Sequence, residues 1–148
     1  MLHLKRTATL VDDHAWVYSG DDAMDKTDPE FDAKYKRALE VGDLSLVPTK
    51  PGSRPTVFWL RHPRGLLRRH IGDVMSGDMA KGLRRIAALT IVKVENDGID
   101  TEWATSRDKD GFPCVPPELM DILDEVDKGI LVNDIGWRIS EVIRPSPL

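Results

Sequence analysis

Cysteine is almost absent from this sequence. The single Cys114 cannot form an internal disulfide, and one thiolate is too few for a structural zinc cage. Cys114 lies between Pro113 and Val115, with no basic neighbour in the sequence to lower the pKa of its thiol, so we do not expect a cysteine nucleophile. The lack of a disulfide framework fits a protein that works in a reducing compartment.

Long apolar runs are also missing. No stretch approaches the roughly 18–20 apolar residues that a membrane-spanning helix needs, and the most apolar segment, 86–94, is interrupted by Thr90 and Lys93. The first seven residues contain no apolar run of signal-peptide length. We therefore expect a soluble protein located in the cytoplasm.

The common catalytic and nucleotide-binding motifs are absent as well. The sequence has no phosphate-binding loop, dinucleotide-binding glycine pattern, serine nucleophile elbow or kinase motif set. The histidines do not indicate a metal site, since His62 and His70 are eight residues apart across Pro63, and the adjacent ligands of the Asp-Asp-His run 12–14 rarely converge on one ion. We predict a non-enzymatic protein with no catalytic residues, no metal site and no cofactor.

Length and composition indicate one globular domain. At 148 residues the chain has the size of a single domain, and its 41% hydrophobic and 31% charged residues are typical of a folded protein. No internal repeat is present. We predict a single domain over 1–148, in which residues 1–27 form an extended or partly mobile N-terminal segment.

Short runs of β-branched and aromatic residues predict a small amount of β-structure. Residues 56–60 (Thr-Val-Phe-Trp-Leu) predict one strand and residues 44–47 another, and we expect the two to pair as an antiparallel hairpin across the proline-rich turn 48–55. A further short strand is expected around 8–11, followed by a turn at 12–14. A hairpin this small needs helices packed against it to be stable.

Apolar residues recur at helical spacing in several segments, and these predict the helices that cover the hairpin. Helices are expected at about 29–41, 64–75, 79–94, 117–127 and 133–143. The residues from Leu89 to Val94 are rich in β-branched side chains and fit a strand as well as a helix, so this alternative stays open. The predicted fold class is α+β: a small antiparallel hairpin or sheet packed by four to five helices, with a helical C-terminal half.

The charged residues are sorted along the chain. The net charge of −4 hides sectors that carry −6 over residues 12–43, +8 over 50–93 and −9 over 95–127, while the remaining residues add +3. Alternating sectors suit segments that pack against each other with complementary charge, and they equally suit a protein that presents a basic face to an acidic partner.

The basic sector holds the candidate partner-binding residues. These are Arg61, Arg64, Arg68, Arg69, Arg84 and Arg85. Arginine forks bind carboxylates or phosphates in bidentate fashion, and on a helix Arg64 and Arg68 share one face. Two interpretations follow: a surface for an acidic protein or for nucleic acid, or ion pairs with the chain's own acidic helices. A pI near 5.5 argues against nucleic acid in particular.

The tryptophans are numerous for a chain of this size. Trp59 and Trp137 are expected in the core. Trp103 lies in the polar segment 99–111, where it is either an exposed contact anchor, as tryptophans often are in binding hot spots, or a loop residue folded back onto the domain.

The run 50–61 (Lys-Pro-Gly-Ser-Arg-Pro-Thr-Val-Phe-Trp-Leu-Arg) resembles a stretch in small accessory proteins of the structural modules of tailed bacteriophages. In those proteins a strand of the pattern P-G-x-x-P-T-x-F-x-L-R is similarly followed by helices. The resemblance covers about residues 40–94 and assigns no functional residue. It implies a virion component or a head or tail assembly factor whose task is protein–protein contact.

We therefore expect a protein-protein interaction or assembly protein whose partner is a structural protein or an acidic protein surface. Nucleic acid is a second possible partner, a homo-oligomer is possible, and no membrane is expected. The alternative function is a small regulator or inhibitor of a nucleic-acid machine that acts by charge complementarity or, through its acidic sectors, by DNA mimicry.

Overall fold

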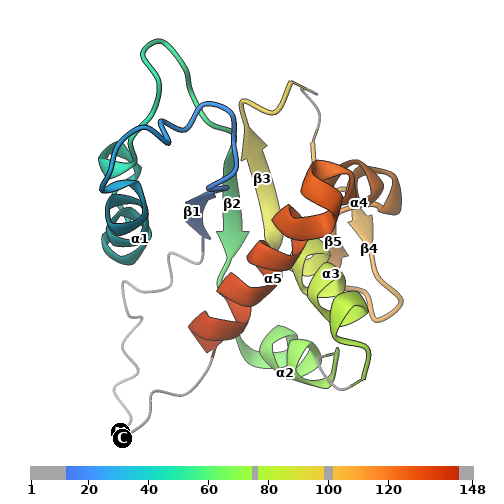
Figure 1. Cartoon of the computed structure of the whole chain (residues 1–148). Helices are drawn as coiled ribbons and strands as arrows, with labels where there is room; N and C mark the ends of the chain where they lie inside the picture. Colours follow the sequence, from blue (N-terminus) through green and yellow to red (C-terminus); the bar gives the residue numbers. More distant parts are fainter. Residues whose placement is uncertain (1–12, 75–76, 99–101, 144–148) are drawn as a thin grey trace, which may run out of the picture.

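The computed structural model describes residues 13–74, 77–98 and 102–143, which form an α+β fold as predicted (Figure 1). Its strands are β1 (Asp13–Val17), β2 (Val57–Arg61), β3 (Ile91–Glu95), β4 (Ser106–Arg107) and β5 (Pro113–Cys114). Its α-helices are α1 (Phe31–Val41), α2 (Gly65–Val74), α3 (Met79–Thr90), α4 (Pro117–Asp124) and α5 (Ile130–Ile143), and its 3-10 helices are η2 (Leu44–Leu46) and η3 (Val126–Gly129). None of the helices in the described ranges is long and apolar enough to span a membrane.

The three longer strands form an antiparallel sheet in the order β1–β2–β3. Because β2 lies in the middle, Trp16 of β1 and Val94 of β3 flank Phe58 on its two sides. Phe58 and Leu60 are buried while their neighbours in β2 are only half-buried, the alternation expected of a strand that packs mainly one face against a core. The strand predicted at 56–60 is thus confirmed with a shift of one residue.

Three of the β-structure predictions are wrong. Residues 44–46 form the 3-10 helix η2, because the Asp43 carboxylate accepts hydrogen bonds from the amide and the hydroxyl of Ser45 and so caps a tight turn. The expected hairpin therefore does not form, and β2 pairs with β1 and β3 instead. Residues 13–14, expected in a turn, begin β1, and the strand expected at 8–11 lies outside the described residues.

The alternative left open for 89–94 is decided in favour of a strand from residue 91 onward, while residues 89 and 90 belong to the helix. α3 ends at Thr90, whose hydroxyl donates a hydrogen bond to the Ile86 carbonyl at 2.8 Å, and β3 starts at the next residue. The β-branched residues that follow Thr90 pack well on a sheet. Asn96 and Gly98 then turn the chain with φ values of 58° and 75°.

The helical predictions hold with shifted ends. Asp28 accepts a hydrogen bond from the amide of Glu30, but α1 begins only at the residue after Glu30. The helix ends before Gly42, whose φ of 73° is the left-handed conformation typical of a helix end. α4 is shorter than predicted, because Asp127 and Lys128 have φ values of 48° and 55° and separate α4 from α5.

Two hydrophobic clusters join the elements. The larger cluster lies between the inner face of the sheet and α2 to α5, and its fully buried members include Leu60, Ile71, Ile86, Ile135 and Ile139. The smaller cluster joins α1 and the preceding turns to the sheet through Val17, Met24, Phe31, Ala38 and Val47. Residues 13–27 of the expected extended or partly mobile segment are therefore packed into the fold.

The tryptophans differ from expectation at two positions. Trp59 is only half-buried on the sheet and belongs to neither hydrophobic cluster, and Trp137 is 38% exposed on α5, so neither lies in the core as predicted. Trp16 and Trp103 are both buried.

Candidate functional site

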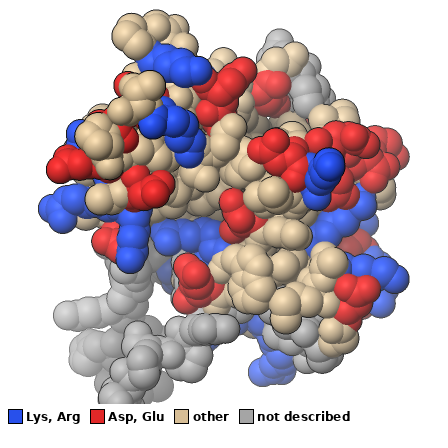
Figure 2. Space-filling model, viewed as in Figure 1, with Lys and Arg blue, Asp and Glu red and all other residues tan. Residues whose placement is uncertain are grey.

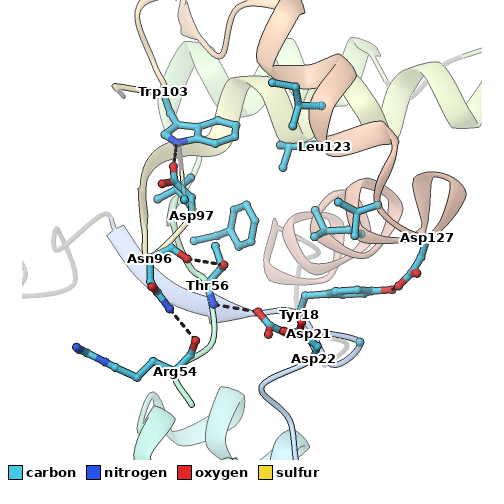
Figure 3. A pocket seen from close by; sticks show the side chains of 17 residues that line it. Tyr18, Asp21, Asp22, Arg54, Thr56, Asn96, Asp97, Trp103, Leu123 and Asp127 are labelled. Atoms are coloured by element: carbon cyan, nitrogen blue, oxygen red, sulfur yellow. Dashed lines mark hydrogen bonds between the residues drawn. The ribbon is translucent and has the colours of Figure 1, made fainter. Parts of the chain in front are cut away.

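The main candidate site is an open groove of about 640 Å³ between one end of the sheet and the helical segment from α4 to α5 (Figure 3). Its walls come from segments that are far apart in the sequence: the turn after β1, the start of β2, the end of β3, the residues before β4, and the α4–η3–α5 connection. We call it the acidic groove, for the reasons given next.

The floor of the acidic groove is apolar. It is formed mainly by Phe58, Val94, Trp103, Leu123, Val126 and Leu131. The indole of Trp103 is held at one side of the groove, because its Nε1 donates a hydrogen bond to Oδ2 of Asp97 at 2.6 Å (Figure 3). Ile122, at the rim, is 48% exposed, so an apolar side chain entering the groove meets apolar surface both at the rim and below it.

The rim carries mostly negative charge. Four carboxylates, those of Asp21, Asp22, Asp97 and Asp127, line the groove, and Arg54 is the one cation among the described lining residues. Carboxylates gathered over an apolar floor favour positively charged ligands, since the low-dielectric wall strengthens their field.

Hydrogen bonds fix most of this rim in place. Asp21 accepts hydrogen bonds from the amides of Ala23 and Thr56, each at 2.9 Å. The Tyr18 hydroxyl donates to Asp127 (Figure 3), and burial together with this hydrogen bond raises the pKa of Tyr18 to about 12. Tyr18 therefore keeps its proton at neutral pH and remains a donor, which leaves the charge on the carboxylate.

A second hollow of about 700 Å³ adjoins the groove along β3. The two hollows share Val94, Asn96, Asp97 and Trp103 among their lining residues. The second also includes Glu102 and the β3 residues from Val92 to Glu95, so acidic side chains continue beyond Trp103.

The structure places the two C-terminal arginines of the basic sector against the chain's own acidic residues. Arg84 pairs with Asp121 at 2.8 Å and with Asp124 at 2.6 Å, both on α4. Charges of both signs lie side by side over the visible face of the molecule (Figure 2). For Arg84 the intramolecular interpretation of the charge sectors therefore holds.

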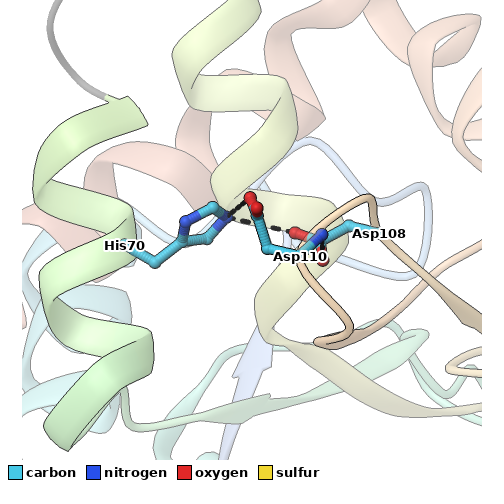
Figure 4. A group of neighbouring side chains, drawn as sticks. All are labelled: His70, Asp108 and Asp110. Atoms are coloured by element: carbon cyan, nitrogen blue, oxygen red, sulfur yellow. Dashed lines mark hydrogen bonds and ion pairs between the residues drawn. The ribbon is translucent and has the colours of Figure 1, made fainter.

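His70, Asp108 and Asp110 form a separate cluster (Figure 4), and Arg85 lies beside it. The His70 Nε2 lies 3.1 Å and 3.5 Å from the two carboxylates, and these three residue types are able to bind a metal ion. However, the Arg85 guanidinium lies 3.2 Å from the same nitrogen and 3.6 Å from each carboxylate, where it balances their charge. We interpret the cluster as an ion-pair network.

This network ties the β4–β5 loop to α2 and α3. Asp108 also accepts hydrogen bonds from the amides of Asp110 and Phe112, and the Phe112 ring stacks on His70 with centroids 4.9 Å apart. Burial alone would raise the pKa of Asp108, but the hydrogen bonds from the two amides and from His70 lower it. The segment predicted as a polar loop is thus held by partly buried polar contacts.

The remaining predicted arginines lie on other elements than Arg84 and Arg85. Arg61 ends β2, Arg64 is half-buried just before α2, and Arg68 and Arg69 are exposed on α2. Trp103 is only 3% exposed, as in the alternative in which its loop folds back, although its indole lines the acidic groove.

Sequence reasoning missed the other groove residues. Tyr18, Asp97, Leu123 and Asp127 lie in four separate segments and form no motif, so only the fold brings them together. Burial raises the pKa of the Cys114 thiol, in agreement with the expectation that it is not a nucleophile.

Comparison with protein-family models, with curated proteins and with solved structures finds no match to the chain. The function therefore has to be inferred from the chemistry of the groove and of the charged surfaces.

Proposed function

We propose that this chain is a non-enzymatic protein-protein interaction protein that takes part in bacteriophage assembly, as a virion component or as a head or tail assembly factor. The observation that carries the proposal is the acidic groove, which combines an apolar floor with a fixed, charged rim. Such a combination suits a protein surface that supplies an apolar anchor and polar contacts around it.

The phage assignment is supported by the resemblance of the 50–61 run, and this run contributes to the groove. Arg54, Thr56 and Phe58 all lie in it and all line the cavity. The run 50–61, on which the resemblance rests, therefore also helps to shape the proposed binding site.

The alternative, a regulator of a nucleic-acid machine that uses the basic sector, has less support. Arg84 and Arg85 are engaged by carboxylates of the same chain, so the basic sector presents less free positive charge than its composition suggests.

The proposal is tested with the structural proteins encoded beside this chain, each purified and mixed with it, with complex formation followed by size-exclusion chromatography and light scattering. We expect one of them to bind, and we expect Ile122→Glu at the groove rim to weaken that binding at least about tenfold, since it places a charge where an apolar contact is needed.

The matched control is Leu46→Glu, the same change at a residue that is 40% exposed in η2 and does not line the groove. It should leave binding unchanged. If none of the structural proteins binds, or if Ile122→Glu and Leu46→Glu have equal effects, the proposal is wrong.

A further inference from the structure

The acidic groove has a complementary surface on the same chain. α2 presents Leu66, which is 71% exposed and the most exposed large apolar side chain of the described residues, and Arg69 is exposed one helical turn further on. An apolar side chain next to a cation is what the apolar floor and the carboxylate rim of the groove are suited to bind.

These two surfaces lie at opposite ends of the sheet. Thr56 and Phe58, at the start of β2, line the groove, whereas α2 follows the other end of the same strand (Figure 1). Within one molecule the groove and α2 are therefore separated by the length of β2. Two copies aligned head to tail bring the groove of one against α2 of the next.

We propose that the acidic groove of one copy binds α2 of a second copy, with Leu66 placed on the apolar floor and Arg69 facing the carboxylate rim. This inference rests on the proposed function, because it takes the groove to be a protein-binding site and names its occupant. Opposite charge favours this occupant, since an acidic segment or a phosphate backbone would meet four carboxylates.

A head-to-tail contact has a structural consequence. Because the two surfaces are different patches, each added copy exposes a new groove and a new α2, so the contact generates a ring or an open filament instead of a closed dimer. Repeated copies related in this way suit a virion component.

The experiment measures the mass of the full chain by light scattering and sedimentation over a wide concentration range, at low and at high salt. We expect the mean mass to rise with concentration at low salt and to fall again at high salt, because the contact pairs exposed charges. A strict monomer under all of these conditions overturns the inference but leaves the proposed function standing if a structural protein still binds through the groove.

Two charge reversals then identify the surfaces. Asp22→Lys changes an exposed groove carboxylate that makes none of the rim hydrogen bonds described above, and Arg69→Glu changes the exposed cation of α2. Each variant alone should raise the dissociation constant of self-association at least about tenfold. The controls are Asp32→Lys and Lys36→Glu, the same reversals at exposed positions on α1, which should associate like the wild type.

Mixing the two variants gives the sharpest test. The Arg69→Glu chain keeps its groove and the Asp22→Lys chain keeps its α2, so one native contact forms between them. The other contact would join the two altered surfaces, where the three unchanged carboxylates of the groove repel the acidic side chain introduced at position 69, so growth then stops. We expect a one-to-one dimer that does not grow with concentration. If the mixture stays monomeric, or if both variants associate as the wild type does, groove and α2 are not partners.

Discussion

His14 is an ionisable residue placed where its charged form is poorly solvated. It lies in β1 opposite Leu60, and its Nε2 is buried with no hydrogen-bond partner among the described residues. Burial lowers the pKa of His14, and the nearby charges of Arg138 and His62 lower it further, while Asp13 acts in the opposite direction. The folded protein therefore favours neutral His14.

This predicts a loss of stability on acidification. The pKa of His14 is lower in the folded state than its ordinary value of about 6.5, so the unfolded chain binds a proton that the folded chain does not. The free energy of unfolding should be intact above about pH 6.5 and should decline as the pH falls through and below this value. Urea unfolding between about pH 7.5 and about pH 5.5 measures this decline.

His14→Gln serves as the comparison, since its side chain is polar and does not titrate. We expect the variant to lose less stability than the wild type over the same pH interval. Other titrating groups contribute equally to both proteins, so the difference between the two pH profiles isolates His14. Parallel profiles would contradict the assignment.

Single residues also mark where sequence reasoning succeeded and where it failed. Trp137 was expected in the core because it is large and apolar, yet it lies two positions from both Ile135 and Ile139, on the opposite side of the helix, and this spacing already indicates exposure. Trp103 is different. It is buried, and its indole donates a hydrogen bond to Asp97. No pattern in the sequence reveals that contact.

At the scale of elements, α3 and α5 pack unusually closely. Gly136 of α5 lies against Leu83 of α3, and a Cβ added at position 136 would approach the Leu83 carbonyl oxygen to 2.9 Å and its Cβ to 2.9 Å as well. Backbone atoms cannot yield as a flexible side chain can, so an added methyl group would push the two helices apart.

We therefore predict that Gly136→Ala destabilises the protein, although the same change inside a helix usually stabilises it by about 0.5–1 kcal/mol. The overpacking should outweigh this gain and cost about 1–3 kcal/mol in the free energy of unfolding, measured by urea denaturation. Glu141→Ala, at an exposed position of the same helix, is the control and should change stability little. A stabilised Gly136→Ala variant would show that the helices have room to adjust.

Elements formed by strong local patterns could be predicted from the sequence, and those decided by competition could not. β2 and the helices follow from β-branched runs and helical spacing. In contrast, η2 replaces a predicted strand because Asp43 caps a tight turn. β1 forms because the backbone of β2 is available to pair with it. The helix and strand propensities of the residues predict neither the turn at η2 nor the pairing of β1.

For the molecule as a whole, the charge sectors were visible in the sequence but their pairing was not. The +8 sector and the −9 sector meet where α3 faces α4, and Arg84 bridges two carboxylates there. The acidic groove could not be predicted from the sequence either, because its walls come from segments spread between Tyr18 and Leu131. Both features require the three-dimensional arrangement of elements that are distant in sequence.

The pairing of the sectors leads to a prediction about Arg84 and Asp121. Their side chains are 39% and 72% exposed, so solvent screens the pair and its coupling should be modest, about 0.2–1 kcal/mol. A double-mutant cycle with Arg84→Glu and Asp121→Lys, read out by urea unfolding at low salt, measures this coupling.

Arg84→Glu alone places three carboxylates together, with Asp121 and Asp124, and should be the least stable of the four proteins. The double variant restores opposite charge at one of the two contacts and should recover part of the loss, and less of it at high salt. A coupling of zero at low salt would mean that the two sectors meet without stabilising each other, and Arg84 would again be a candidate for contact with a partner. A coupling that salt does not reduce would contradict the ionic origin assigned to it.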